Sequence, residues 1–289
     1  MNLRLERTRR FKNALAVALA CLATLLGLGF LASILFTTLQ RGIAAFGTAL
    51  FVRITAHGAE GGLANAMVGS VIIDLMAILI AAPIGVAAGT WLAEYAARTR
   101  LGAFIRFMND ILLSAPSIVL GLFIYMVVVL PMTAATDGAV SFSALAGALA
   151  LALIALPVIV RSTDEMLRLV PASLREAALS LGVPQWKLTV QVLLRAASSG
   201  ILTGILLALA RLAGETAPLL FTAFGNNYMA YGPLDKMATL PTTIYQYTND
   251  PDPAMHAIAW AGALLVTVFV LALGLLARTL VHRGSHRHD

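Results

Sequence analysis

The sequence predicts an all-α polytopic membrane protein with six transmembrane helices. Of its 289 residues, 60% are hydrophobic and only 12% are charged, and the mean hydropathy is +0.87. About a quarter of the residues of a soluble domain are usually charged, so this chain is expected to bury its apolar surface against lipid and neighbouring helices. Apolar runs of spanning length recur along the chain, with basic residues gathered at their ends. Each run must be helical, because a backbone in hydrocarbon has to form its hydrogen bonds internally.

Six runs meet the requirement of about 20 mostly apolar residues for crossing a bilayer. They cover residues 13–38, 65–93, 103–130, 141–160, 197–224 and 255–280. The first run follows a basic N-terminus, but it carries no charge from Asn13 to Gln40, which is too long for the core of a signal peptide and predicts a retained helix. Prolines within the later runs predict kinks at Pro83, Pro116, Pro157 and Pro218.

The positions of the basic residues predict which side of the membrane holds the termini. Six spans leave both ends of the chain on one side. Of the 20 Lys and Arg residues, only Arg41, Arg53 and Lys236 fall between spans on the opposite side. The positive-inside rule therefore predicts that both termini are cytoplasmic. We do not expect nucleic-acid binding, because the basic residues form no single patch, and the one cysteine, Cys21, can form no disulfide within the chain.

Two connections between spans are long. The external one, residues 225–254, contains Tyr228, Tyr231, Tyr245 and Tyr247. Tyrosine favours the boundary between membrane and water, so we expect a partly embedded or short helical segment there. The other connection is cytoplasmic, covers residues 161–196 and includes "PASLREAALSLGVPQWKLTVQVLL" at 171–194.

The start of this cytoplasmic stretch predicts a two-turn amphipathic helix over 173–182. Ser173 and Glu176 have the spacing of a capping box, and Gly182 followed by Pro184 marks the end of the helix. Between these signals, one face is formed by Leu174, Ala177, Ala178 and Leu181. So short a helix is marginal alone. Its apolar face could pack on its own membrane domain, or it could dock into a groove of a cytoplasmic partner.

The same stretch, with "EAALSLG" at its centre, resembles the EAA loop of the permeases of ABC importers. Glu176, Ala177, Ala178 and Gly182 match the motif, and Val192 and Leu194 match its later apolar positions, whereas Arg195 stands where the family pattern has proline. In that family the loop forms a coupling helix that inserts into a cleft of the ATP-hydrolysing subunit. The resemblance therefore implies docking, through Ser173, Glu176, Ala177, Ala178, Leu181 and Gly182.

Further segments resemble the PstA type of phosphate-importer permease, in register across five helices. They are "GGLANAMVGSVIIDLMAILIAAPIGVAAGTWLAEYA" (61–96), "APSIVLGLFIY" (115–125), "LPVIVRSTDEMLRLVPASLREAALSLGVPQWK" (156–187) and "GILLALARLAGETAPLLFTA" (204–223). The resemblance implies a type I ABC-importer permease (MetI-like) fold with its core at 61–280, in the cell inner membrane. Residues 1–60 and the basic tail 281–289 are not distinctive.

The resemblance also implies partners. These would be a PstC-like second permease, two copies of an ABC ATPase and a periplasmic phosphate-binding protein. The chain has no P-loop of its own, since none of Lys12, Lys187 and Lys236 lies in a G-x-x-x-x-G-K-[ST] motif. We therefore expect this subunit to bind no cofactor or metal, the partner to use ATP and magnesium, and the chain itself not to be an enzyme.

The predicted fifth helix carries a charged pair, Arg211 and Glu215, near its middle. A charge at the bilayer centre costs about 2.5–3.5 kcal/mol on insertion scales. The pair could simply fix the orientation of the helix. However, acid before base is the more stabilising order at this spacing, and here the base comes first. The alternative interpretation is a transient anion site, in which phosphate competes with Glu215 for the planar guanidinium of Arg211 and Thr216 adds a hydroxyl.

Other polar residues in the predicted spans are Asp74, Asn109 and Asp110. They are expected to face inward, where they line the path or bond neighbouring helices. Gly85-x3-Gly89 and Gly200-x3-Gly204 have the small-xxx-small spacing that allows close helix packing. Two rival functions remain open at this point. One is a permease for another oxyanion or small solute, and the other is an ion-coupled secondary transporter with Glu215 and Asp74 as a proton relay.

Overall fold

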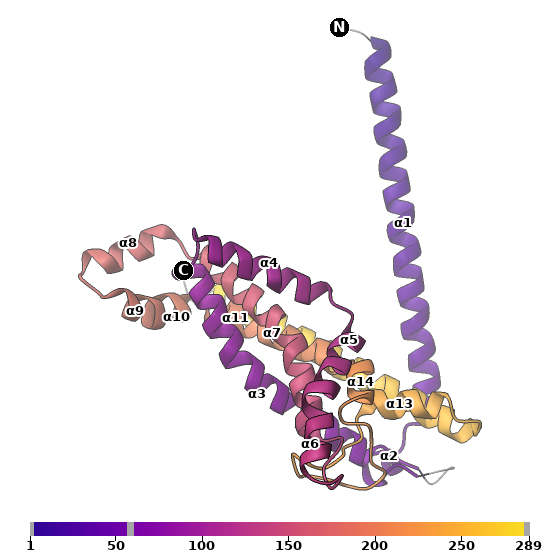
Figure 1. Ribbon diagram of the computed structural model, residues 1–289. Coiled ribbons are helices and arrows are strands. Elements are labelled where there is room, and N and C mark those ends of the chain that lie inside the picture. Colours follow the sequence, from indigo (N-terminus) through magenta and orange to yellow (C-terminus); the bar gives the residue numbers. More distant parts are fainter. Residues whose placement is uncertain (1–2, 57–60, 286–289) are drawn as a thin grey trace.

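The computed structural model describes residues 3–56 and 61–285, and every regular element in that part of the chain is a helix (Figure 1). Five helices are long and apolar enough to cross a membrane within the described residues. They are the spans Arg9–Ala44 in α1 (Leu3–Ala44), α3 (Ala64–Glu94), Ser117–Ala135, α7 (Ala144–Leu169) and Pro253–Thr279 in α14 (Pro253–Ser285). A sixth span results if a bent pair of helices is counted as one.

The third span begins later than the sequence predicted. The run expected as one helix over 103–130 is broken at Ala115 and Pro116, both of which have extended backbone. The part before the break is α4 (Arg100–Ser114), and the part after it is α5 (Ser117–Ile124), a π-helical turn η1 (Tyr125–Val129) and α6 (Leu130–Ala135). Proline disfavours helical geometry in the residue before it, so Pro116 causes a break where a kink was expected. Helices α3 and α7, by contrast, continue through Pro83 and Pro157.

The fifth span also differs from the predicted helix over 197–224. It consists of residues 185–196 followed, after a bend of 67°, by α11 (Ser198–Leu212). Residues 185–196 form α9 (Gln185–Lys187), a π-helical stretch η2 (Leu188–Leu193) and α10 (Leu194–Ala196). Beyond Leu212 the helix stops, and only one further turn follows, α12 (Ala217–Leu220). The expectation that Arg211 and Glu215 lie in the middle of one helix was therefore wrong.

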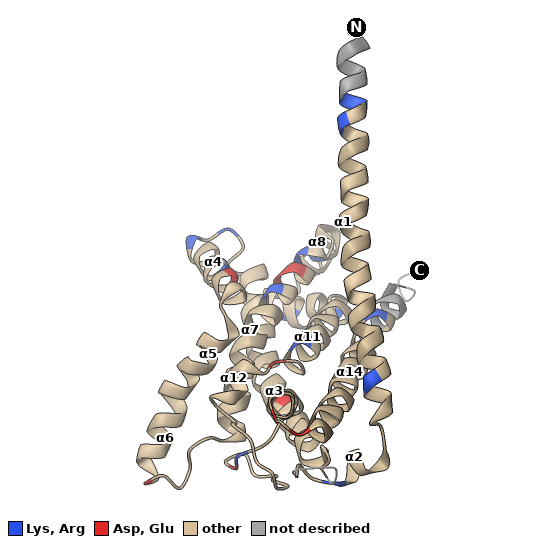
Figure 2. Ribbon diagram, turned by 90° about the vertical axis from the view of Figure 1, so that its right-hand side faces the viewer, with Lys and Arg blue, Asp and Glu red and all other residues tan. Residues whose placement is uncertain are grey.

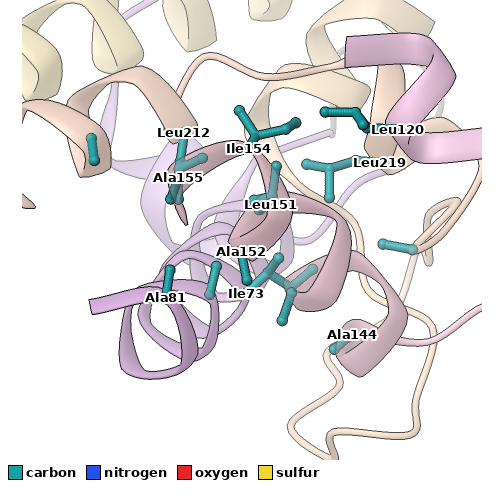
Figure 3. Close-up of a cluster of buried hydrophobic side chains, with 14 of the residues drawn as sticks. Ile73, Ala81, Leu120, Ala144, Leu151, Ala152, Ile154, Ala155, Leu212 and Leu219 are labelled. Atoms are coloured by element: carbon teal, nitrogen blue, oxygen red, sulfur yellow. The ribbon is translucent and has the colours of Figure 1, made fainter. Parts of the chain in front are cut away.

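The core lies where α3 and α7 pack side by side (Figure 3). The buried residues of both helices are mostly alanine, with some isoleucine and leucine, and the small alanine side chains allow the two helices to approach closely. Ile73, Ala77 and Ala81 of α3 are fully buried, as is Leu151 of α7. Leu212 and Leu219 bring the ends of α11 and α12 onto the same cluster, so the break in the fifth span is anchored to the core.

Both glycine pairs singled out in the sequence pack against α7. A Cβ on Gly85 would lie 2.8 Å from Cγ2 of Ile159, and one on Gly89 would lie 2.6 Å from Cβ of Thr163. Gly200 and Gly204 of α11 leave the same kind of space for Met166 and Ser162 of α7. The prediction of close helix packing at these positions is confirmed, and it fixes α3, α7 and α11 as one unit.

Helix α1 stands apart from this unit for most of its length (Figure 1). None of its best membrane-spanning window is buried. Its contact with the rest of the chain is made near its end, where Arg41 lies over the ring of Trp260 in α14 and Gly42 meets Leu264. Most of α1 is therefore exposed in the part of the chain that the structure describes.

The two ends of the bundle differ in charge. The end that carries α4 and α8 (Ala172–Ser180), here called the α8 end, holds most of the basic residues in Figure 2. The opposite end, here called the α2 end, carries α2 (Thr48–Val52), α6 and the segment 221–239. The expected short helix in 225–254 is present as α13 (Leu240–Thr248). At the C-terminus, α14 continues into the predicted tail as far as Ser285. The rest of the tail, 286–289, lies outside the described residues, as do 1–2 and 57–60 of the predicted N-terminal region.

Candidate substrate and coupling sites

The break after α11 places a charged pair next to the core. Arg211 lies in the last turn of α11, and Glu215 follows in the non-helical segment before α12. The local sequence explains the break, because Gly214 is a poor helix former and Pro218 can provide no backbone N–H. Pro218 instead packs directly on α5, where a Cβ added to Gly121 would lie 2.5 Å from its Cα. The pair is thus held at a junction of α5, α11 and α12.

The two charges contact each other only loosely. Nε of Arg211 lies 3.8 Å from Oε1 of Glu215, which is too long for a hydrogen bond. The Arg211 side chain is 44% exposed and that of Glu215 is 16% exposed. The described residues provide no hydrogen bond to the guanidinium of Arg211 or to the hydroxyl of Thr216 at the start of α12. A guanidinium with unused donors can accept an anion without first breaking a strong contact.

The other polar residues expected in the spans lie elsewhere. Asp74 is buried in α3, with 8% of its surface exposed, and no partner for its carboxyl occurs in the described part of the chain. Asn109 and Asp110 do not open the third span but lie on α4, before the break. The Asn109 amide donates to the carbonyl of Pro157 at 3.1 Å, and Asp110 lies 3.6 Å from Arg161, so both contact α7. The structure does not bring these three residues together with Arg211.

Helix α8 projects from the α8 end of the bundle, and none of its residues is buried. Its C-cap is Leu181, and the next residue, Gly182, has a φ of +75°, the left-handed conformation in which glycine ends a helix. The N–H of Gly182 donates to the carbonyl of Leu179 at 2.9 Å, and that of Val183 donates to Ala178 at 3.3 Å. This pair of bonds is the Schellman motif, which fixes where the helix ends.

The start of α8 corrects one prediction. The N-cap is Pro171, with no side-chain cap, and Ser173 already lies inside the first turn. Ser173 and Glu176 therefore form no capping box. The backbone carbonyl of Pro171 accepts from the N–H of Leu174 at 3.2 Å, so the first turn closes from Pro171 without a side-chain cap.

The predicted apolar face of α8 is divided between two environments. Ala178 faces the bundle and packs, with Val183, on a cluster that contains Leu167 and Leu193. Leu181 is 82% exposed, and Leu174 and Ala177 open onto an apolar groove of about 990 Å³ between α7, α8 and α11. This face is thus only partly covered: Ala178 packs on the bundle, Leu174 and Ala177 border the groove, and Leu181 is exposed.

Sequence reasoning missed the ion pairs that hold the α8 end together. Arg106 of α4 pairs with Asp164 of α7 at 2.8 Å, and Arg168 joins the same carboxylate at 3.0 Å. Arg175 of α8 pairs with Glu94, the last residue of α3, at 2.6 Å. Arg106 and Asp164, and likewise Arg175 and Glu94, lie far apart in the sequence, so no spacing rule could have found these two pairs, whereas Arg168 and Asp164 lie four residues apart on α7.

Apolar spans, one of them broken beside a charged pair, are features of membrane transporters, which commonly build their sites on discontinuous helices. Residues 81–285 match the family of binding-protein-dependent transport system inner membrane components, so the chain belongs to that family. It is 55% identical over 282 residues to the phosphate transport system permease protein PstA of Xylella fastidiosa, with 97% of this chain and 96% of the relative covered. PstA of Yersinia pestis is 47% identical, with 96% and 92% covered, and the probable PstA of Methanocaldococcus jannaschii is 34% identical, with 92% of each covered.

The fold has a counterpart among solved structures. The inward-facing MetNI methionine ABC transporter aligns with a TM-score of 0.59 and 19% identity, over 75% of this chain and 93% of that chain. The predicted MetI-like permease fold and the predicted resemblance to PstA-type permeases are both confirmed.

Proposed function

We propose that this chain is the transmembrane subunit of an ATP-driven importer that moves inorganic phosphate from the periplasm to the cytoplasm. The observation that carries the proposal is the 55% identity to a PstA phosphate permease along 97% of the chain. A match over 97% of the chain leaves few residues unaligned. A different substrate would therefore have to be recognised by a protein that is otherwise similar to that permease along nearly its whole length. The α8 end is assigned to the cytoplasm on the positive-inside rule.

The architecture supports a multi-subunit complex. The best membrane-spanning window of α1 has none of its residues buried in the described structure, which suits packing on a second, PstC-like permease in the same membrane. Helix α8 offers Leu181, Leu174 and Ala177 to a cytoplasmic partner, which suits insertion into an ABC ATPase, with one ATPase copy below each permease. A periplasmic phosphate-binding protein would deliver the substrate at the α2 end.

Arg211 is the residue proposed to meet the substrate. Its planar guanidinium can hold phosphate through two parallel hydrogen bonds, and its charge does not titrate away. In the absence of substrate the carboxylate of Glu215 lies 3.8 Å from Nε of Arg211 and attracts it without a hydrogen bond. When phosphate arrives, it displaces Glu215, and the hydroxyl of Thr216 adds a further donor. Competition from Glu215 keeps binding weak, as a translocation path requires, because the ion must also leave.

The energy comes from the partner. ATP binding would close the two ATPases, move α8 and switch the path at Arg211 between outward and inward access. This subunit contributes the path and the coupling helix, and the hydrolysis of ATP takes place in the other chain.

The test is uptake by the purified complex in proteoliposomes. We expect radiolabelled phosphate to accumulate only with ATP and an active ATPase, with no effect of a protonophore at constant ATP. Uptake that the protonophore abolishes, and that needs no ATPase, would instead establish a secondary transporter. Competition by sulfate as strong as that by unlabelled phosphate would show that the substrate is a different or broader class of oxyanion.

A further inference from the structure

One ion pair fastens α8 to the end of α3. Nη1 of Arg175 donates to both carboxylate oxygens of Glu94, each at 2.6 Å. The Glu94 side chain is only 5% exposed and that of Arg175 is 26% exposed. Nη2 of Arg175 also donates to the carbonyl of Leu167 near the end of α7, again at 2.6 Å. A single arginine of the exposed helix therefore links it to both helices of the core.

This link is a charge-assisted contact that is mostly shielded from solvent. Hydrogen bonds between charged groups are shorter and stronger than neutral ones, and removing either partner would leave a buried charge without compensation. The pair of Arg161 and Glu165 gives a contrast, because it lies four residues apart on one helix with both side chains more than half exposed. Exposed pairs of that kind contribute little.

The far end of α3 is fastened to the segment at the α2 end. The amide of Asn65, in the first turn of α3, donates to the carbonyl of Asn226 at 2.7 Å. One turn further on, the hydroxyl of Ser70 accepts from the N–H of Leu240 at 2.8 Å. Between them Gly69 leaves room for the carbonyl of Ala238. The segment 226–240 is thus held to α3 at three successive points.

Helix α3 spans the distance between these two attachments without interruption. Its 31 residues correspond to about 46 Å at 1.5 Å per residue. Close packing on α7 at Gly85 and Gly89 restrains it from bending independently. Helix α3 is therefore a continuous connection between Glu94 at the α8 end and the segment 226–240 at the α2 end.

We propose that Arg175 and Glu94 are positioning residues that transmit the movement of α8 through α3 to the segment 226–240, where substrate enters. The inference rests on the proposed function, since it names the route by which the ATPase reaches the outer side of the path. It assigns the pair a role in coupling that is separate from the docking of α8 itself, which uses the uncovered residues on the other side of the helix.

The experiment compares Glu94→Gln and Arg175→Lys in the complete reconstituted complex, with Glu165→Gln as the control at an exposed pair. Three quantities are measured: retention of the ATPase subunit, phosphate transported per ATP hydrolysed, and an optical signal from the outer segment. The last comes from a fluorophore on Tyr228→Cys in a Cys21→Ser background, since Tyr228 is 73% exposed within that segment. Its emission is recorded on addition of ATP with vanadate.

We expect both variants to keep the ATPase subunit and to continue hydrolysing ATP, while phosphate per ATP falls by at least about fivefold, the lower end of typical coupling between linked sites. The emission change should shrink in parallel, and the control should behave as the unaltered complex. An unchanged ratio and signal would overturn the proposal. So would a loss of the ATPase subunit, or an equal fall in hydrolysis and transport, since either outcome marks a structural role. If the unaltered complex shows the emission change but moves no phosphate, the proposed substrate is wrong. The role of Arg175 and Glu94 is then tested by whether the two variants reduce the emission change.

Discussion

Shortening Leu181 to alanine tests whether the end of α8 enters a partner subunit. Leu181 occupies the C-cap of α8, directly before Gly182, and is 82% exposed. Its backbone is fixed by the Schellman bonds that follow it. Leu181→Ala should therefore leave the helix in place and remove only the apolar surface that a partner would cover.

The size of the effect follows from the exposed surface. The substitution removes three carbon atoms, which at about 0.8 kcal/mol each are worth about 2.4 kcal/mol when fully buried. Leu181 is 82% exposed in the isolated chain, so burying these atoms in a partner would contribute about 2 kcal/mol to the free energy of docking. Because about 1.4 kcal/mol corresponds to a tenfold change in Kd, the affinity for the ATPase should fall about 30-fold.

The assay is a titration of purified ATPase subunit onto membranes that contain the two permeases. Leu234→Ala is the matched control, because Leu234 is 48% exposed in the segment at the α2 end, on the opposite face. A Kd for Leu181→Ala within twofold of the unaltered protein would refute the docking of this residue. A similar loss for Leu234→Ala would show that the effect is not specific to α8.

Three further predictions concern positions that the fold fixes. Gly182→Val forces a branched residue into a φ of +75°, so the observed end of α8 should become less favourable by about 1–2 kcal/mol. ATPase binding should then weaken about tenfold in the same titration. Gly47→Val, at an N-cap with extended backbone, should leave the binding unchanged. Gly89→Leu should destabilise the bundle by about 1–3 kcal/mol through its clash with α7, measured by thermal unfolding in detergent, and Gly29→Leu, with open space around it, should leave the midpoint unchanged. Asn65→Ala removes the hydrogen bonds to Thr55 and to the carbonyl of Asn226 and leaves buried groups unpaired, which should cost about 1–3 kcal/mol of stability. Protease added from outside should then cut the segment 226–240 faster, and an unaltered rate of cutting would contradict this role of Asn65.

The sequence predicted the number and type of the spans better than their limits. Hydropathy measures composition over a window and does not register where the backbone stops being helical. The run 103–130 remains apolar through Pro116, and the run 197–224 remains apolar through the break after Leu212. Prolines mark both places, but a proline within an apolar run can leave a helix continuous, as Pro83 and Pro157 do, or lie at a break, as Pro116 does.

The candidate site was predictable to the extent that its chemistry is local. Arg211 and Glu215 stand out in an apolar stretch, and Gly182 marks a helix end by residue type alone. The start of α8 was misjudged because Pro171, rather than Ser173, begins the helix. The pair of Glu94 and Arg175 could not be found, because 81 residues separate its members and only the packing of α3, α7 and α8 brings them together.

The most direct test of the account is the initial rate of phosphate uptake by Arg211→Gln in a complex that retains its ATPase subunit. Arg161→Gln is the control, since Arg161 is also an arginine with a carboxylate four residues later, but on the exposed side of α7. If Arg211 meets the anion, uptake by Arg211→Gln should be lost while the complex stays assembled, and Arg161→Gln should transport normally. Near-normal uptake by Arg211→Gln would contradict the central claim.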